Sequence, residues 1–189
     1  MTSWVAGTSD WRREIVAFID ETEVNSIVID IKDYTGMVSF DITEFEELSE
    51  LGSYENRIPD IREFIEYLHS KDIYVIGRLS VFQDPALVKK RPDLAVKRAS
   101  DGGVWTDYKG ISWLDAGSKE VWDYTIDIAR ASYDVGFDEI NFDYVRFPSD
   151  GNMKDIHFPF SEGKEKSKVV QSFFAYIDEA LRPEGIVIS

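Results

Sequence analysis

Short apolar runs and amphipathic stretches alternate along the chain. The runs are rich in Val and Ile, as expected of buried strands, and lie at 24–33, 73–82, 137–148 and 185–189. Between them an apolar residue recurs every three or four positions, which predicts helices at 10–19, 59–68, 118–136 and 166–181. Strands separated by helical crossovers form a parallel sheet, so these strands should be adjacent, parallel and in chain order.

The sequence also predicts the structure of the beginning of the chain and the character of two long connections between strands. Ser3–Ala6 is expected to form a short first strand, which makes 137–148 the fourth strand and 185–189 the fifth. The helix that follows Ser3–Ala6 is expected to bury Trp11, Ile15, Phe18 and Ile19. The connections at 34–58 and 83–111 are long for a compact domain, and such connections are either functional or loosely packed.

The order of elements favours an α/β fold of the (β/α)8 TIM-barrel type. No glycine-rich phosphate loop follows a strand, which argues against a nucleotide-binding sheet. Polar residues instead recur where the strands end, and parallel barrels have their active sites at those ends. A closed barrel has eight strands and typically about 250 residues. Residues 1–189 are therefore expected to form a single domain, truncated to about the first five strands.

The composition indicates that acid–base chemistry would come mainly from carboxylates, and it disfavours several partners. A net charge of −15 disfavours nucleic acid as a partner, because that contact requires clustered Lys and Arg. Cysteine is absent and only two histidines occur, so no thiolate or multi-histidine metal centre is expected, and no cofactor is indicated. No apolar run is long enough to span a bilayer. The first residues lack the layout of a secretion signal, and the sequence leaves the compartment open.

The segment FDEINFDYVRFPSDG (137–151) contains the strongest catalytic candidate. Phe142 alternates with Asn141 and Asp143, so one face of this strand is bulky and the other is polar. A carboxylate that points into a buried sheet without a partner is costly, so its presence requires a reason. Asp143 is therefore predicted to be catalytic, and the structural alternative is that it caps a loop or pairs with Arg146.

Other polar and aromatic residues near the strand ends are expected to bind or orient a substrate. They are Asp30, Lys32, Tyr34, Arg78, Trp113, Asp115, Asn141 and Arg146. Asp30, Arg78 and Asp143 should converge in a shared pocket, because neighbouring parallel strands bring their ends together. Salt bridges are the alternative role for Lys32 and Arg78, and a turn is the alternative role for Asp115.

Four segments together resemble a known protein family: VNSIVIDIKDYTG, YVIGRLSVFQDP, WLDAGSKEVWDY and GFDEINFDYVRFPSDG. Over nearly its whole length the chain is similar to a bacterial family of glycoside hydrolases with a TIM-barrel domain, distantly similar to the α-amylase clan. In that clan the nucleophilic aspartate ends the fourth strand, so the resemblance implies this role for Asp143. Asn141 stands where the clan usually has an arginine. The implied substrate is a polysaccharide or an oligosaccharide.

The same resemblance implies that the general acid follows the strand at 185–189 and lies beyond Ser189. Glycoside cleavage requires two carboxyl groups, so the chain by itself is expected not to hydrolyse glycosides. Five strands do not close a barrel, and the open edges are expected to promote self-association. Two other functions stay open: a barrel that binds carbohydrate without catalysis, and an Mg²⁺ or Ca²⁺ site formed by Asp30, Asp115 and Asp143.

Overall fold

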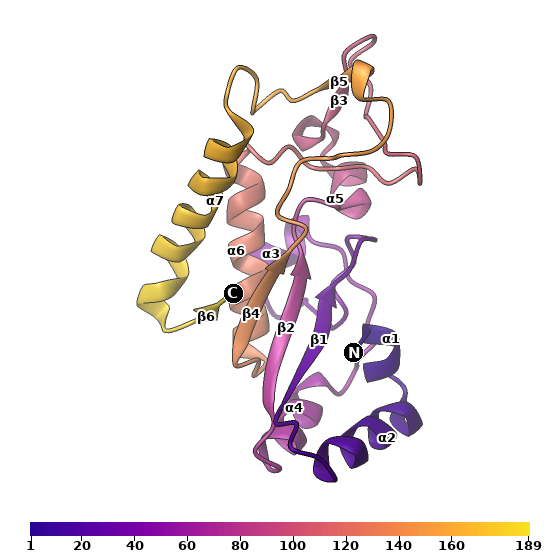
Figure 1. The fold of residues 1–189 in the computed structure, drawn as a ribbon, viewed down its shortest axis with the longest axis vertical. Coiled ribbons are helices and arrows are strands. Elements are labelled where there is room, and N and C mark those ends of the chain that lie inside the picture. Colours follow the sequence, from indigo (N-terminus) through magenta and orange to yellow (C-terminus); the bar gives the residue numbers. More distant parts are fainter.

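A four-stranded parallel sheet forms the centre of the molecule in the computed structural model, which describes all 189 residues. Its strands lie in the order in which the chain reaches them: β1 (Ser26–Lys32), β2 (Tyr74–Ser80), β4 (Glu139–Asp143) and β6 (Val187–Ile188). Every neighbouring pair in this sheet is parallel (Figure 1). The predicted parallel order is therefore confirmed, and the sheet has half of the eight strands of a closed barrel.

Helices connect these strands and cover one side of the sheet. The α-helices are α1 (Ser3–Ala6), α2 (Ser9–Asp20), α3 (Glu46–Leu51), α4 (Ile61–His69), α5 (Pro85–Lys90), α6 (Lys119–Asp134) and α7 (Lys166–Leu181). Short 3-10 helices are η1 (Pro92–Leu94), η2 (Met153–Asp155) and η3 (Arg182–Glu184). Helices α6 and α7 pack against each other on the left of the sheet in Figure 1. The helices lack the length and apolar character that a membrane crossing requires.

The two faces of the sheet have different surroundings. Side chains on one face, such as Ile29 and Ile140, are completely buried. The next side chain on this face, Phe142, meets Phe173 of α7 edge-on, with ring centroids 6.3 Å apart. Alternate residues of a strand point to opposite faces, so Asp143 lies on the other face. That face is open toward the viewer in Figure 1, and most of the residues on it are partly exposed, although Ser80 is buried.

The predicted first strand at Ser3–Ala6 is wrong, because these residues form helix α1. Thr2 caps the helix by accepting a hydrogen bond from the N–H of Val5 at 3.4 Å. Ser3 and Ala6 are its buried residues. Burial three residues apart fits a helical turn, whereas a strand would bury alternate residues. The sheet therefore has four strands rather than five. Asp143 ends the third of them along the chain, so the count that placed it at the end of the fourth strand is wrong.

Three predicted helices have the expected buried faces and one does not. The confirmed helices α4, α6 and α7 bury the apolar residues Ile61, Phe64, Ile65, Leu68, Val121, Tyr124, Ile128, Ala129, Val169, Phe173, Ile177 and Leu181. In α2, by contrast, Trp11 and Phe18 are 54% and 61% exposed, and Val16 and Ile19 are the buried residues. Helix α2 packs mainly against the short helix α1, so only a narrow strip of its surface is covered.

The long connections after β2 and β4 fold together above the carboxyl ends of the strands (Figure 1). Strand β3 (Lys97–Arg98) of the first connection pairs antiparallel with β5 (Ile156–His157) of the second. The indole N–H of Trp105 also donates to the carbonyl of Asn152 at 3.1 Å. These contacts determine which residues beyond the strand ends stay accessible.

Candidate active site

Asp30, Arg78 and Asp143 converge at the carboxyl ends of β1, β2 and β4. Asp30 lies opposite Arg78 in the sheet. The guanidinium of Arg78 donates from Nε to Asp143 Oδ2 at 2.7 Å and from Nη1 to Asp30 Oδ1 at 3.1 Å. The predicted convergence is therefore present. The expected enclosure is not, because the side chains of Arg78 and Asp143 are 39% and 40% exposed on the open face.

The environment of Asp143 keeps its carboxyl group ionised. Desolvation raises the pKa of Asp143, but the hydrogen bonds from the Tyr144 N–H and from Arg78, with the charges of Arg78 and Arg146, lower it by more. The net pKa lies below the usual value for an aspartate. Desolvation lowers the pKa of Arg78, but its hydrogen bonds to Asp143 and Asp30 raise it overall. A carboxylate held in this way can act as a nucleophile or stabilise a cation, and it is a poor general acid.

The strand ends abruptly at Asp143 because of the conformation of the next residue. Tyr144 has a left-handed backbone with φ of 55°, which is uncommon for a residue other than glycine. Its N–H donates to Asp143 Oδ1 at 2.6 Å. The expected strand over 137–148 is therefore shorter than predicted. Strained backbone of this kind is concentrated at functional sites, where the surrounding structure maintains it.

Trp113 was expected to bind or orient a substrate, but its ring is covered. Its side chain is only 1% exposed. The indole N–H donates to Asp107 Oδ2 at 3.2 Å. The guanidinium of Arg146 lies over the ring, 5.3 Å from its centroid. Trp113 therefore supports Arg146 from below and does not line an open cleft.

Asp115 has a structural role, and its predicted place at the substrate site is wrong. It is fully buried and accepts hydrogen bonds from the N–H groups of Gly117, Phe160 and Ser161 at 2.9, 2.8 and 3.3 Å. These bonds fasten the connection before α7 to the start of α6. Because Asp115 is occupied in this way, it does not join Asp30 and Asp143. No three His, Asp or Glu side chains are arranged to share a metal ion, which removes the basis for the metal-site alternative.

Lys32 also lies outside the site, because β1 is irregular between Asp30 and Lys32. A shift of one residue reverses the face on which a side chain lies. The Lys32 side chain is therefore buried, and its Nζ donates to Asp84 Oδ2 at 2.7 Å. Its predicted substrate contact is wrong, and the alternative of a salt bridge is correct. Sequence reasoning did not single out Asp84, although an aspartate before a proline is a recognisable helix cap.

Two of the remaining candidates lie near the carboxyl ends of the strands. Asn141 is on the same face of β4 as Asp143, and its Nδ2 donates to Ser189 Oγ at 3.0 Å. Tyr34 follows β1 and is 57% exposed. Their contacts with a substrate remain predictions.

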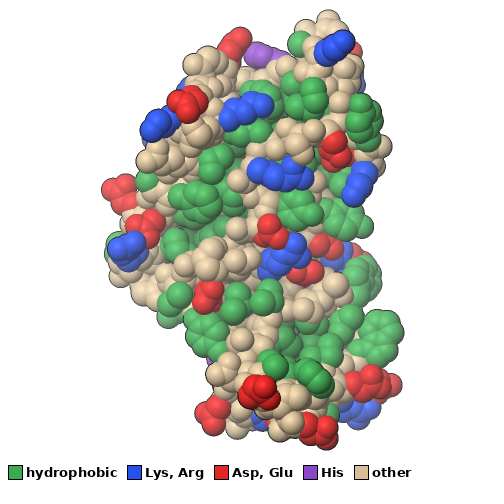
Figure 2. All heavy atoms as spheres, viewed as in Figure 1, with side chains coloured by type: hydrophobic (Ala, Val, Ile, Leu, Met, Phe, Trp, Pro, Cys, Tyr) green, Lys and Arg blue, Asp and Glu red, His purple; other side chains and the backbone are tan.

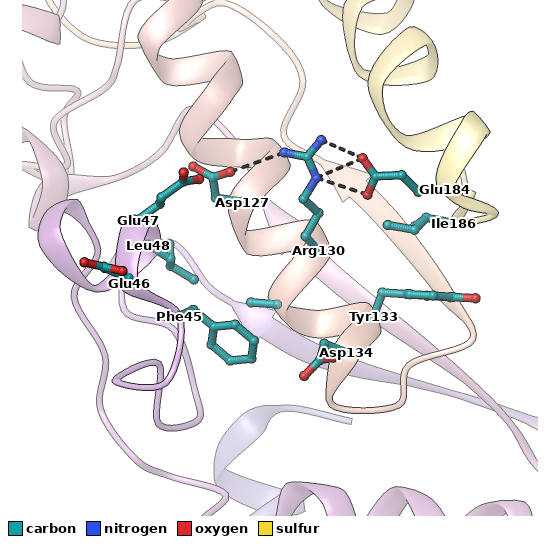
Figure 3. A pocket seen from close by; sticks show the side chains of 11 residues that line it. Phe45, Glu46, Glu47, Leu48, Asp127, Arg130, Tyr133, Asp134, Glu184 and Ile186 are labelled. Carbon is teal, nitrogen blue, oxygen red and sulfur yellow. Dashed lines mark hydrogen bonds and ion pairs between the residues drawn. The ribbon is translucent and has the colours of Figure 1, made fainter.

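A hollow of about 560 Å³ lies elsewhere, between α3, the end of α6 and the segment that leads to β6 (Figure 3). Arg130 crosses this hollow and donates to Glu184 at 2.6 Å. Desolvation and the charge of Glu47 raise the pKa of Asp127 there. The hollow is on the helical side, near the point where α6 leads into the amino end of β4. Barrel enzymes have their active sites at the opposite ends of the strands, so this hollow is not part of the candidate site.

Solved structures with similar folds include one chain of similar length. A hypothetical protein from Ruminiclostridium thermocellum ATCC 27405 is 38% identical, with a TM-score of 0.90 over 100% of this chain and 94% of that one. Larger enzymes also have similar folds. An α-galactosidase from Thermus thermophilus has a TM-score of 0.62 at 18% identity, and a GH31 α-xylosidase from a soil metagenome has 0.65 at 15%. These matches cover 90% and 98% of this chain but only 32% and 29% of the enzymes.

These likenesses establish a fold of the glycoside-hydrolase TIM-barrel type. No curated protein sequence matches the chain. One family model, described as "Putative glycosyl hydrolase domain", matches residues 1–189. The chain therefore belongs to the family that this model describes.

Proposed function

We propose that the carboxyl end of the sheet is the active site of a glycoside hydrolase, in which Asp143 is the nucleophile or stabilises the transition state. The observation that supports this proposal is the bridge from Arg78 to Asp143 and Asp30 on the open face. Ion pairs as exposed as Arg78 and Asp143 contribute about 0–1 kcal/mol to stability. A purely structural role is therefore a weak explanation for three ionisable groups at the ends of three neighbouring strands.

The proposed chemistry follows from the charge state of Asp143. Glycoside cleavage passes through a transition state with oxocarbenium character, which a nearby carboxylate stabilises or attacks. Arg78 fixes the orientation of the Asp143 carboxylate and keeps it ionised. Asp30, Asn141 and Tyr34 would contact sugar hydroxyl groups. The general acid is a second carboxyl group, which would lie in a part of the complete barrel outside the four strands.

The substrate proposed is an oligosaccharide or polysaccharide. The structural neighbours include an α-galactosidase and an α-xylosidase, which favours α-linked sugars for the first assays. The chain spans 32% and 29% of the length of those two enzymes. Residues 1–189 are accordingly proposed to be one section of a single barrel domain, and the hydrolysis of natural glycosides is proposed for the complete barrel.

Activated substrates allow Asp143 to be tested without the general acid. A 2,4-dinitrophenolate leaving group departs without protonation, so 2,4-dinitrophenyl α-glycosides of glucose, galactose and xylose require only the nucleophile or stabilising carboxylate. We expect slow release of dinitrophenolate from at least one of them and no cleavage of polysaccharides. The Asp143→Asn variant should reduce that release by about 100-fold or more. The matched control is Asp150→Asn, which makes the same change at an exposed residue of the following connection.

The alternatives predict different results in the same assay. Equal rates for the Asp143→Asn and Asp150→Asn variants would show that Asp143 is not catalytic. Binding of oligosaccharides without any release of dinitrophenolate would support a barrel that binds carbohydrate without catalysis. Robust cleavage of polysaccharides by the chain would show that a second carboxyl group is already present in it.

A further inference from the structure

Arg146 differs from every other arginine in the chain. The sequence contains ten arginines, and nine of them form a salt bridge with an aspartate or a glutamate. Arg146 forms none, although the chain has a net charge of −15. In so acidic a protein, an arginine without a carboxylate partner is an unusual arrangement that invites a functional explanation.

The guanidinium of Arg146 is supported by two aromatic rings. It lies 5.3 Å from the centroid of Trp113 and 5.5 Å from that of Tyr144. Its one hydrogen bond is from Nη1 to the hydroxyl of Ser149, at 2.6 Å. A guanidinium has five N–H donors, so most of them stay free at this exposed position. Stacking on the buried indole of Trp113 orients the planar guanidinium group before a ligand binds.

The position of Arg146 connects it with the candidate active site. It follows Asp143 by three residues, and its backbone N–H donates to the carbonyl of Tyr144 at 2.9 Å. Tyr144 in turn donates its own N–H to Asp143. The free guanidinium and the candidate nucleophile are therefore parts of one short, hydrogen-bonded segment at the carboxyl end of β4.

The connection that contains Arg146 is less acidic than the rest of the chain. Residues 144–168 carry five basic side chains, at Arg146, Lys154, Lys164, Lys166 and Lys168. They carry four acidic side chains, at Asp150, Asp155, Glu162 and Glu165. The sum is +1, in a chain whose total is −15. Figure 2 shows basic side chains spread over the upper half of this face, where hydrophobic groups also gather. The basic side chains of this connection therefore offset its acidic ones, and the carboxylate of Asp143 lies directly before it.

We propose that Arg146 forms a subsite for an oxyanion carried by the sugar substrate, such as the carboxylate of a uronic acid. The inference rests on the proposed function and specifies its substrate class. The fork of a guanidinium binds a carboxylate or a sulfate through two parallel hydrogen bonds, which a neutral hydroxymethyl group does not accept in this way. Arg146 thereby selects acidic saccharides, and Asp143 acts on the adjoining glycosidic bond.

Pairs of ligands that differ in one group test this selection. The Asp143→Asn variant is used so that the ligands are not cleaved. Calorimetry measures how tightly it binds p-nitrophenyl α-glucoside and p-nitrophenyl α-glucuronide. The corresponding α-galactoside and α-galacturonide form a second pair. The 6-sulfate of the glucoside distinguishes a sulfate from a carboxylate. At least one anionic ligand should bind more tightly than its neutral counterpart. Adding Arg146→Gln should reduce this preference by about 10- to 100-fold. Arg182→Gln, a remote exposed arginine, is the control.

The outcomes separate this inference from the proposed function. Equal affinity for acidic and neutral members of every pair, or a preference that survives Arg146→Gln, overturns the anionic subsite. Failure of all ligands to bind also overturns it. In each of these cases the dinitrophenyl assay still decides independently whether Asp143 is catalytic. A preference that falls in Arg146→Gln, is partly kept in Arg146→Lys and is unchanged in Arg182→Gln supports the subsite.

Discussion

Asp143 is ionised and also accessible, a combination that its neighbours make possible. Desolvation at the sheet opposes ionisation, and the hydrogen bonds from Tyr144 and Arg78 outweigh this effect. The side chain is nevertheless 40% exposed, so a ligand can approach it. Arg78 is shared between Asp143 and Asp30, and its loss would leave two carboxylates on one face without their common partner.

The pH dependence of activity should therefore respond to Arg78. Because the pKa of Asp143 is lowered in the folded protein, the active ionised form persists to a lower pH than for an ordinary aspartate. The Arg78→Gln variant removes a donor and a charge, so the acid limb of kcat/KM for an activated glycoside should move to higher pH. Arg78→Lys, which keeps the charge, should move it less. An acid limb that stays in place in Arg78→Gln would mean that Asp143 does not control it.

At the scale of the elements, the end of β1 is fixed by a buried ion pair. Lys32 and Asp84 have side chains that are 1% and 0% exposed, and Asp84 also accepts the N–H of Leu87 at the start of α5. This pair connects β1 to the connection after β2, directly beside the candidate site. The strand irregularity that places Lys32 here leaves Asp30 on the open face.

The Lys32–Asp84 pair should be strongly coupled energetically. Lys32→Met leaves a buried carboxylate without its partner and should lower the free energy of unfolding by about 3–5 kcal/mol. The double variant Lys32→Met, Asp84→Asn should lose less than the sum of the two single losses, since it leaves neither charge uncompensated. Chemical denaturation of the three variants and the parent chain measures this coupling. Additive losses would indicate that the two side chains do not interact in solution.

The sequence predicted those elements in which a regular pattern reflects burial. In helices α4, α6 and α7 and in the parallel strands, the apolar residues repeat at a regular spacing over several turns or residues. This spacing shows which face of each element is buried. Ser3–Ala6 has only four residues and shows no period. A single irregularity in β1 places Lys32 on the opposite face of the sheet from Asp30, and the pattern of side chains does not reveal such an irregularity. Asp115 is bound by Phe160, 45 residues away, and such a contact depends on how the long connections fold together.

At the scale of the whole molecule, the sheet is open on one face and along β6, whereas Met1 covers the β1 edge through hydrogen bonds with Val28 and Asp30. A hollow of about 480 Å³ lies beside β6, lined by Phe142, Phe174, Ile188 and their neighbours. Phe174 is 43% exposed and Val187 is 49% exposed. An exposed strand edge with apolar surroundings is a template for association with another chain. In a closed barrel this surface would be covered by the next strand and helix.

The chain is therefore expected to self-associate through the β6 edge. Sedimentation velocity over a range of concentrations should show a reversible shift from monomer to larger species. Phe174→Lys places a charge in the hollow and should move this shift to higher concentration. Tyr108→Lys, at a residue that is 81% exposed on the connection before α6, is the control. A concentration-independent monomer, or equal effects of both substitutions, would contradict association through this edge.

Chemical rescue tests most directly whether Asp143 performs the reaction. The Asp143→Gly variant removes the carboxylate and leaves a space that a small anion can enter. With a 2,4-dinitrophenyl α-glycoside that the parent chain cleaves, azide or formate should restore the release of dinitrophenolate in a concentration-dependent way. The same anions should leave the Asp150→Gly variant unaffected. Rescue confined to Asp143→Gly is the predicted result. Full activity of Asp143→Gly without added anion would contradict a catalytic role, and so would a folded but inactive variant that neither anion rescues.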